Sequence, residues 1–281
     1  MDSKHILDCR TNYIGRQYLW LEDTDSTNEV IKRLLLEDVT IESIGGDLHG
    51  LLEGVPENGF VIVADHQTKG KGRSGRVWED KKGNNIAMSI LLKPEVAVDN
   101  TSIVTLVSAL AVARAIRMMS GLDVSIKWPN DVIIEDRKVC GILTELVIRQ
   151  GVPYVIVGIG VNVNQANVSP QIADRAISMY QASGSGVIYD REELVESICT
   201  ELERYYHIYE QTGDMTGLKD EYEGLLINTD RRVSVLDPGE SMEGVAKGID
   251  TLGRLIVESD DGKLHHIYAG EVSVRGVYGY V

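Results

Sequence analysis

Four apolar runs follow one another between residues 124 and 163, and this stretch constrains the fold more than any other. Glu135-Asp136-Arg137 separates the second run from the third, and Arg149-Gln150-Gly151 separates the third from the fourth. Turns this short cannot contain the crossover helix that parallel strands require, so these strands are expected to pair antiparallel. The runs predict strands at 124–128, 132–134, 139–148 and 154–163.

Helical patterns and further strands flank this block, which predicts an α+β fold. Ser26 and Glu29 have the spacing of a capping box, and Asn100 and Asp190 are expected to cap two longer helices. The glycine-rich, acidic stretch 37–59 is expected to be irregular. Apolar periodicity predicts helices at 26–37, 102–119 and 190–210. Uninterrupted apolar runs predict further strands at 60–64 and 86–92.

The pattern changes after residue 226, where short strands alternate with glycine-containing turns. Evenly spaced short strands with turn residues between them are typical of a small β-barrel, here of about 50 residues. The predicted strands are 232–236, 242–248, 255–258 and 265–269. We therefore expect two domains, a mixed α+β domain over 1–226 and a small all-β module over 227–281.

The charge balance and the cysteines limit the function classes. The chain carries 28 Lys and Arg against 43 Asp and Glu, a formal net charge of −15, which argues against sequence-independent nucleic-acid binding. Cys9, Cys140 and Cys199 are widely spaced and odd in number, so they form neither a disulfide framework nor a CxxC metal site. Free thiols of this kind suit a reducing cytosol.

The sequence has no evident membrane signal. The first ten residues lack the apolar core of a signal peptide, and the most apolar helical run, 102–113, is too short to span a bilayer. We expect a cytoplasmic protein with no membrane partner.

A glycine-rich cationic loop follows the predicted strand 60–64. Residues 70–78 read GKGRSGRVW, with three cations inside an acidic chain. Glycine allows backbone N–H groups to approach a ligand, and the cations supply charge-assisted hydrogen bonds to phosphate or carboxylate. The loop is not a Walker A motif, because Arg76-Val77 stands where Lys-Ser/Thr is required. It is equally compatible with a solvated glycine hairpin.

Two further polar clusters interrupt the apolar block. Residues 127–131 read KWPND, followed by Lys138 and Gly141, and residues 158–164 read GIGVNVN. Asn130 and Asp131 alone could form a plain turn. Asn162 and Asn164 lie within an apolar strand, where a buried amide is costly unless it is paired. A bulged strand with satisfied amides is the simpler interpretation of the second cluster.

Taken together, the motifs closely resemble those of biotin–protein ligases. From about Tyr13 to Gly276 the chain contains STN, Q-x-x-G-K-G-R-x-G-R-x-W, KWPND, K-x-x-GIL-x-E, GIGVNVN and GEVSVRG in that order. The resemblance implies a catalytic domain like that of class II aminoacyl-tRNA synthetases, with helices on one face of a mixed, mostly antiparallel sheet. It also implies an SH3-like C-terminal module.

The resemblance implies a two-step reaction. Biotin and ATP, with Mg²⁺, form biotinoyl-5′-AMP and pyrophosphate. A specific lysine of a biotin carboxyl carrier domain then takes the biotinoyl group. Larger relatives carry an N-terminal DNA-binding domain, and repression of that kind is not expected here. Relatives include monomers and dimers, so a homodimer remains open.

The resemblance also suggests residue roles. Ser26, Thr27 and Gln67 should bind the ureido ring of biotin, although Ser26 could equally be a helix cap alone. Lys138 should bring the biotin carboxylate and the α-phosphate together. The remaining expected biotin contacts are Gly70, Lys71 and Gly141. Lysine at 71 replaces an arginine common in the family, so the loop backbone is expected to matter more than this side chain.

The nucleotide is expected to lie against the loop and the other motifs. Asp131 is expected to bind Mg²⁺, or to orient Lys127 or the incoming amine. Trp78 could stack on adenine or simply pack in the core. The expected ATP and adenylate contacts are Arg73, Arg76, Trp78, Lys127, Asn130 and Asn162. We expect the glycine loop to order over bound adenylate and exclude water.

Three other functions would fit parts of the pattern. A lipoate or octanoate ligase shares the fold and chemistry, but KWPND, GIGVNVN and the C-terminal GEVSVRG favour biotin. A biotin-binding or adenylate-binding sensor without catalysis would need neither a lysine at 138 nor a loop of arginines. A plain α+β interaction protein would leave six ordered motifs unexplained.

Overall fold

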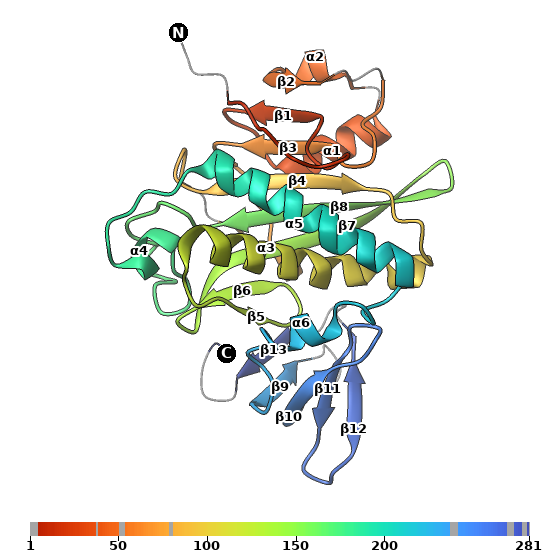
Figure 1. Ribbon diagram of the computed structural model, residues 1–281, viewed down its shortest axis with the longest axis vertical. Coiled ribbons are helices and arrows are strands. Elements are labelled where there is room, and N and C mark those ends of the chain that lie inside the picture. The colour runs from red at the N-terminus through yellow and green to blue at the C-terminus, as the bar shows by residue number, and fades with distance from the viewer. Residues whose placement is uncertain are drawn as a thin grey trace.

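A computed structural model describes residues 5–37, 39–50, 54–78, 81–236, 241–268, 273–276 and 280. Eight strands form the main sheet in the order β2-β1-β3-β4-β8-β7-β6-β5 (Figure 1). The strands are β1 (Tyr18–Leu21), β2 (Asp47–His49), β3 (Val61–Ala64), β4 (Ile86–Leu92), β5 (Ser125–Lys127), β6 (Asp131–Ile134), β7 (Arg137–Arg149) and β8 (Val152–Val161). Of the neighbouring pairs, β1 and β3 run parallel and the others antiparallel, which confirms the mixed, mostly antiparallel sheet.

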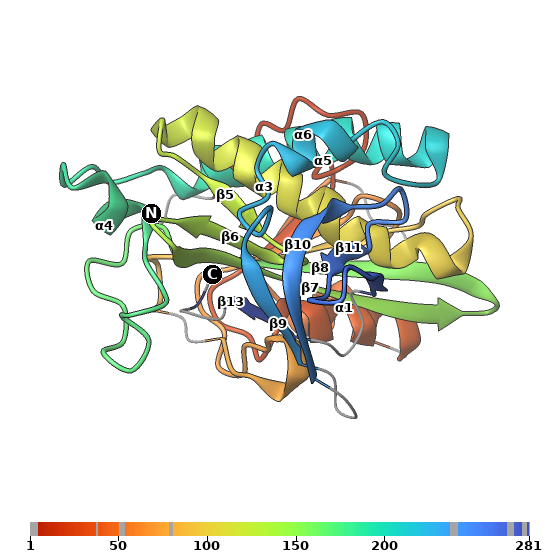
Figure 2. The same cartoon turned by 90° about the horizontal axis from the view of Figure 1, so that it is seen from below.

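Helices cover both faces of this sheet. The helical elements are α1 (Thr27–Leu36), α2 (Ile41–Ile44), η1 (Arg73–Gly75), η2 (Val98–Ile103), α3 (Val104–Ser120), α4 (Met179–Ser183), α5 (Arg191–Thr212) and α6 (Lys219–Glu223). Figure 2 shows α1 on the opposite side of the sheet from α3 and α5, so the expectation that the helices share one face is wrong for α1. Alternation along β1 supplies both cores: Tyr18 and Trp20 join the larger core with α3 and α5, and Leu19 and Leu21 join the smaller core with α1.

Helix starts were predicted less well than helix bodies. Asp190 caps α5 as expected, accepting hydrogen bonds from the backbone N–H groups of Glu192 and Glu193. Ser26 is the N-cap of α1, but its side chain makes no capping hydrogen bond. The reciprocal bond of a capping box is also absent, because Glu29 pairs with two lysines and the Ser26 N–H donates to Asp25 Oδ1 at 2.8 Å. Asn100 donates to the carbonyl of Gly213 rather than capping α3, which begins after the 3₁₀ turn η2. The capping box and the Asn100 cap are therefore wrong.

The stretch 37–59 is more regular than expected. Its described residues contain α2 and β2, and β2 pairs antiparallel with β1. Strand β1 was not predicted either. Both strands are short, and β2 gains its pairing only from a strand about thirty residues earlier in the chain, so local periodicity carries little signal for it.

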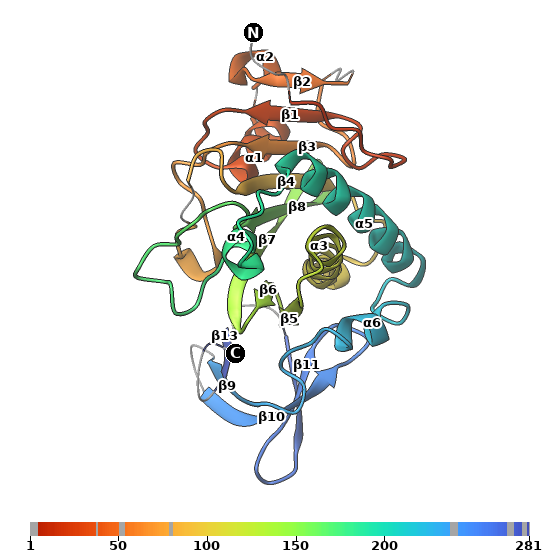
Figure 3. The ribbon, with the colours of Figure 1, turned by 60° about the vertical axis from the view of Figure 1, so that its left-hand side comes forward.

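The apolar helical region is part of the protein core. Val98–Ser120 is, within the described ranges, the one helical stretch long and apolar enough to cross a membrane. However, 72% of its apolar window is buried inside the protein. Helix α3 packs between the sheet and α5 (Figure 3), as the core helix of a globular domain does.

A second sheet follows the main domain and has the order β12-β11-β10-β9-β13. Its strands are β9 (Arg232–Leu236), β10 (Ser241–Ile249), β11 (Leu255–Glu258), β12 (Leu264–Ile267) and β13 (Ser273–Gly276). All of its pairs are antiparallel, in agreement with the expected small SH3-like module. Strand β13 was not predicted. The turn at 237–240, the predicted strand end at Ala269 and the first half of GEVSVRG lie outside the described residues.

Trp128 links the two sheets. It is 1% exposed, its backbone N–H donates to Asn228 Oδ1 at 2.8 Å, and its indole Nε1 donates to the carbonyl of Gly253 at 2.9 Å. The KWPND motif thus connects strand β5 with the C-terminal module. The division of the chain at residue 226 stays a prediction.

Trp128→Phe is expected to lower the free energy of unfolding by about 2 kcal/mol, because it removes a buried hydrogen bond and leaves a cavity. Chemical denaturation measures this loss. Trp20→Phe is the matched control: Trp20 is also buried, but its indole nitrogen has no hydrogen-bond partner among the described residues. A loss no larger than that of the control would contradict the proposed link.

Candidate functional site

The two central strands β7 and β8 present different side chains on their two faces. Ile142 and Ile159 face the core under α3 and α5. On the opposite face, Gly141 lies beside Gly160, and Leu143 lies beside Gly158. Alternation in a strand sends successive side chains to opposite faces, so at the glycines β7 and β8 contribute no side chain to this face. Side chains from other parts of the chain can therefore approach the backbone of the sheet here.

Side chains already lie close over these glycines. A Cβ atom added at Gly160 would lie 2.5 Å from the Trp78 ring, and one added at Gly158 would lie 2.5 Å from Asn28 Oδ1. A Cβ at Gly141 would lie 2.7 Å from Lys138 Nζ. At these positions glycine allows a close approach of side chains rather than an unusual backbone conformation, although at Gly141 the neighbouring atoms belong to the flexible end of Lys138.

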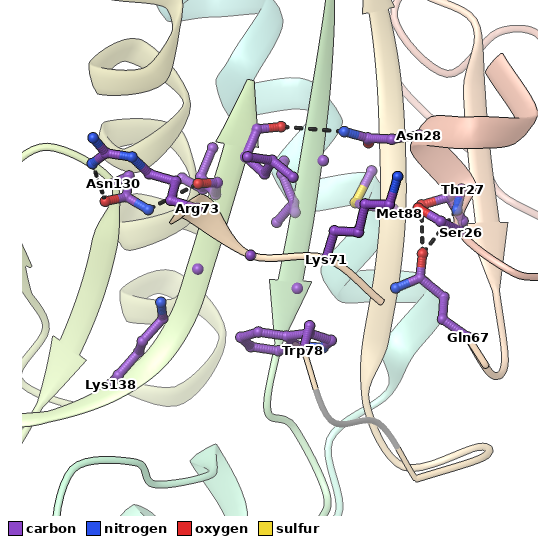
Figure 4. A pocket seen from close by; sticks show the side chains of 17 residues that line it. Ser26, Thr27, Asn28, Gln67, Lys71, Arg73, Trp78, Met88, Asn130 and Lys138 are labelled. Carbon is purple, nitrogen blue, oxygen red and sulfur yellow. Dashed lines mark hydrogen bonds between the residues drawn. The ribbon is translucent and has the colours of Figure 1, made fainter. Parts of the chain in front are cut away.

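These residues line a pocket that holds about 480 Å³ of space. Figure 4 shows Ser26, Thr27 and Gln67 on one side, Arg73, Asn130 and Lys138 on the other, and Trp78 between them. This space includes the part of the pocket that is open to solvent. The two polar ends of the pocket differ, since one carries neutral hydrogen-bonding groups and the other carries cations.

The neutral end is a connected hydrogen-bond network. Gln67 Oε1 accepts from the backbone N–H of Thr27 at 2.8 Å and from its hydroxyl at 3.1 Å. Ser89 Oγ lies 2.6 Å from Thr27 Oγ1 and 2.5 Å from Asn28 Oδ1. Asn28 in turn donates to Glu145 at 2.7 Å. Each amide and hydroxyl is thereby held in one orientation, as selective recognition of a polar ring requires.

The cationic end is built around Lys138. Its Nζ lies 2.6 Å from Asp131 Oδ1 and 5.9 Å from the centre of the Trp78 ring. Arg73 donates to Asn130 Oδ1 at 3.0 Å. Burial lowers the pKa of the Arg73 guanidinium from its ordinary value, while the nearby Asp131 carboxylate favours the charged form. Two cations therefore face the same end of the pocket.

Asp131 is engaged through both carboxylate oxygens. Oδ1 pairs with Lys138, and Oδ2 accepts a hydrogen bond from the Tyr280 hydroxyl at 2.5 Å. Burial raises the pKa of Asp131, but the Lys138 charge and hydrogen bond, the Tyr280 hydrogen bond and the Lys127 charge together outweigh it, and the net pKa is lowered. The carboxylate is therefore ionised in the folded protein at neutral pH.

The glycine loop is held to both sides of the pocket. Lys71 Nζ pairs with Glu29 of α1 at 2.7 Å, and Arg73 reaches Asn130. Within the loop, the N–H of Gly72 donates to the carbonyl of Arg76 at 2.7 Å, and that of Trp78 donates to Gly70 at 3.0 Å. Ordering of this loop on ligand binding stays a prediction.

The structure brings most of the predicted site residues together. Nine of them line the pocket, namely Ser26, Thr27, Gln67, Lys71, Arg73, Trp78, Asn130, Lys138 and Gly141. Gly70 is hydrogen-bonded to Trp78, and Asp131 is paired with Lys138, so both adjoin it. Lys127 is buried beside Tyr280.

Two predicted ATP contacts lie elsewhere. Arg76 is exposed. Asn162 is buried, and its side chain donates to the carbonyl of Ile177 at 3.3 Å, a structural role in joining β8 to the segment before α4. Neither lines the pocket in the part of the chain that the structure describes.

Several residues that line the pocket, or that contact its lining residues, were not predicted. Asn28 belongs to the STN motif and Gly158 and Gly160 to GIGVNVN, so the motifs contained them without showing their role. Ser89 is a buried hydroxyl in the otherwise apolar strand β4, and that exception was a usable signal. Tyr280 had no signal, because its partner Asp131 lies 149 residues away.

No protein-held metal site is evident at the cationic end. Among the described residues, no group of three or more His, Cys, Asp or Glu side chains could hold a metal ion. Both oxygens of Asp131 already have partners. These residues do not fit a magnesium ion bound to Asp131 in this arrangement.

Comparisons with known families agree with the two-sheet organisation. Residues 46–162 match the biotin/lipoate A/B protein ligase family. Residues 230–275 match the biotin protein ligase C-terminal domain.

Individual relatives extend the match over most of the chain. The bifunctional ligase/repressor BirA of Bacillus spizizenii is 36% identical over 251 residues, covering 88% of this chain and 75% of the relative. The biotin–[acetyl-CoA-carboxylase] ligase of Mycobacterium tuberculosis is 30% identical over 78% of this chain and 80% of its own. A biotin protein ligase from Aquifex aeolicus solved with biotin and ATP has a TM-score of 0.74 at 29% identity, covering 92% of this chain and 98% of that one.

Proposed function

Because the chain belongs to the biotin protein ligase family, we propose that it joins biotin and ATP into biotinoyl-5′-AMP and transfers the biotinoyl group to a lysine. The acceptor is a lysine of a biotin carboxyl carrier domain, the class of protein on which this family acts. One observation carries the assignment: a single pocket has a neutral hydrogen-bond network at one end and an anchored lysine at the other.

The neutral end suits the ureido ring of biotin. That ring has N–H donors and a carbonyl acceptor, and Ser26, Thr27 and Gln67 offer both kinds of group. Ser26 lines the pocket and makes no side-chain capping hydrogen bond to α1, so helix capping does not occupy its hydroxyl. The glycines of β7 and β8 let Asn28, Lys138 and Trp78 lie close against the sheet, which leaves the pocket between these side chains for the ring system and its chain.

The cationic end suits the reacting groups. In the first step a biotin carboxylate oxygen attacks the α-phosphorus of ATP, the new O–P bond forms, and the bond to pyrophosphate breaks. Lys138 and Arg73 place positive charge where two anions must approach each other, which lowers the barrier of such a step. Asn130 orients Arg73 from the turn between β5 and β6.

We assign Asp131 chiefly to the positioning of Lys138. Its Oδ1 holds the ammonium group, and its Oδ2 is occupied by Tyr280. A role in binding Mg²⁺, or in taking the proton of the incoming amine, would require one of these partners to leave. Mg²⁺ prefers to retain waters and bind phosphate oxygens, so it would arrive with ATP.

In the second step, the neutral amine of the carrier lysine attacks the carbonyl of the mixed anhydride. The new C–N bond forms, the C–O bond to AMP breaks, and the nitrogen loses one proton to solvent. A free lysine has a pKa near 10.4, so reaching the neutral amine at pH 7 costs about 4.6 kcal/mol. A cytoplasmic location, the lack of nucleic-acid and membrane partners and the homodimer stay predictions.

The function is tested with α-labelled ATP and Mg²⁺, adding biotin, lipoate or octanoate in parallel, and then a carrier domain. Labelled acyl-AMP with biotin alone, followed by biotin on one carrier lysine, is the expected result. If acyl-AMP forms with lipoate or octanoate instead, that acid rather than biotin is the substrate. Tight biotin binding without any adenylate formation would indicate a non-catalytic biotin-binding sensor.

A further inference from the structure

A residue close to the C-terminus reaches the cationic end of the site. Tyr280 follows β13, the last strand of the C-terminal module, yet its hydroxyl donates to Asp131 Oδ2 at 2.5 Å. Its ring lies beneath Lys127, with Nζ 3.5 Å from the ring centre. Tyr280 therefore makes two contacts with KWPND, one through the phenol and one through the ring.

These contacts are of the kinds that hold a side chain in place. A hydrogen bond from a hydroxyl to a carboxylate is charge-assisted, and an ammonium group over an aromatic face is attracted by the ring quadrupole. The Asp131 side chain is only 14% exposed and the Lys127 residue only 4%. Water therefore has little access to Asp131 and Lys127, and it could take the place of the phenol as a hydrogen-bond donor only if the surrounding side chains moved.

The other carboxylate oxygen of Asp131, Oδ1, contacts Lys138, the residue proposed to act in adenylation. Asp131 lies on β6 opposite Gly141 of β7, and its Oδ1 holds Lys138 Nζ at 2.6 Å. A carboxylate rotates as a unit, so a bond that fixes Oδ2 also fixes the direction of Oδ1. Lys138 is 27% exposed and has a long flexible stem, so without such an anchor its ammonium could move away from the pocket.

We propose that Tyr280 is a positioning residue for the adenylation step, acting through Asp131 to hold Lys138 against the pocket. The inference rests on the proposed function. The C-terminal module thereby contributes a side chain to the site itself, in addition to packing against the catalytic sheet through Trp128.

Tyr280→Phe in the full-length protein tests this, because it removes the hydroxyl and keeps the ring beneath Lys127. The kcat for biotinoyl-5′-AMP formation should fall about tenfold, the usual effect of losing a hydrogen bond to a charged group. The KM for biotin should change by less than about twofold, since the neutral end is untouched. Tyr268→Phe is the matched control: it removes an exposed tyrosine hydroxyl from the same module, outside the site.

A double-mutant cycle distinguishes positioning from a general effect on folding. If Tyr280 acts through Asp131, then Tyr280→Phe should have almost no further effect in an Asp131→Asn background. Equal losses in both backgrounds, an unchanged kcat, or a loss confined to KM would overturn the inference. A faster transfer step would also overturn it, since the phenol would then occupy the place of the acceptor lysine. Failure of the wild-type protein to form any adenylate would instead refute the proposed function.

Discussion

Lys138→Met is expected to slow the formation of biotinoyl-5′-AMP by about a thousandfold, the scale found when a preorganised electrostatic group is removed from an active site. Methionine keeps much of the length of lysine but carries no charge. The biotin carboxylate and the α-phosphate would then approach each other without the ammonium group that faces Gly141 and Trp78. A single-turnover assay with α-labelled ATP measures the effect.

The substitution also changes the neighbour of Lys138. Asp131 would lose the largest of the influences that lower its pKa, so the pKa of this buried carboxyl should rise and the folded protein should become less stable. The double variant Lys138→Met/Asp131→Asn should recover stability without recovering activity. Lys82→Met is the matched control, because Lys82 is half exposed and pairs with Asp23 away from the pocket. If the adenylation rate of Lys138→Met is within tenfold of the wild-type rate, the proposed role of Lys138 in this step is wrong.

Arg73→Gly is expected to release biotinoyl-5′-AMP about ten to a hundred times faster than the wild type, because one charge-assisted anchor of the intermediate is lost. The substitution also removes the bond between η1 and Asn130 that ties the glycine loop across the pocket. Lys71 would still hold the other side of the loop through Glu29. The released adenylate should biotinylate lysines indiscriminately.

Two measurements test this prediction. Retention of labelled adenylate on gel filtration reports release, and labelling of an unrelated protein added to the reaction reports loss of acceptor selectivity. Arg76→Gly, in the same loop, is the comparison variant. It should release biotinoyl-5′-AMP more slowly than Arg73→Gly, since Arg76 is exposed. Adding Lys138→Met to Arg73→Gly should suppress the labelling, because adenylate then forms about a thousandfold more slowly. Unchanged selectivity in Arg73→Gly would show that the loop does not retain the intermediate through this residue.

Much of the fold was predictable because its signals are local. The strands at 139–148 and 154–163 and their antiparallel pairing followed from apolar runs joined by a three-residue turn. The bodies of α1, α3 and α5 followed from helical periodicity. Helix starts were less predictable, because the side chains near Ser26 and Asn100 had partners from other elements.

The candidate site likewise has features that the sequence predicted and features that depend on distant parts of the chain. The motifs contained nine residues that line the pocket, and the glycines of β7 and β8 were visible in the sequence. They did not show that Asn162 faces a structural partner, or that α1 and the pocket share the face opposite α3.

What the sequence determined by itself was most of the strands, the three longer helices, the antiparallel arrangement of the strands between residues 124 and 163, and a group of polar residues typical of a biotin ligase. These depend on neighbours within a few residues, where turn length and periodicity act directly. Tertiary structure alone decided that β2 joins the sheet edge and that Tyr280 meets Asp131. Such contacts join segments far apart in the chain, and they form only when the two cores and the C-terminal module pack together.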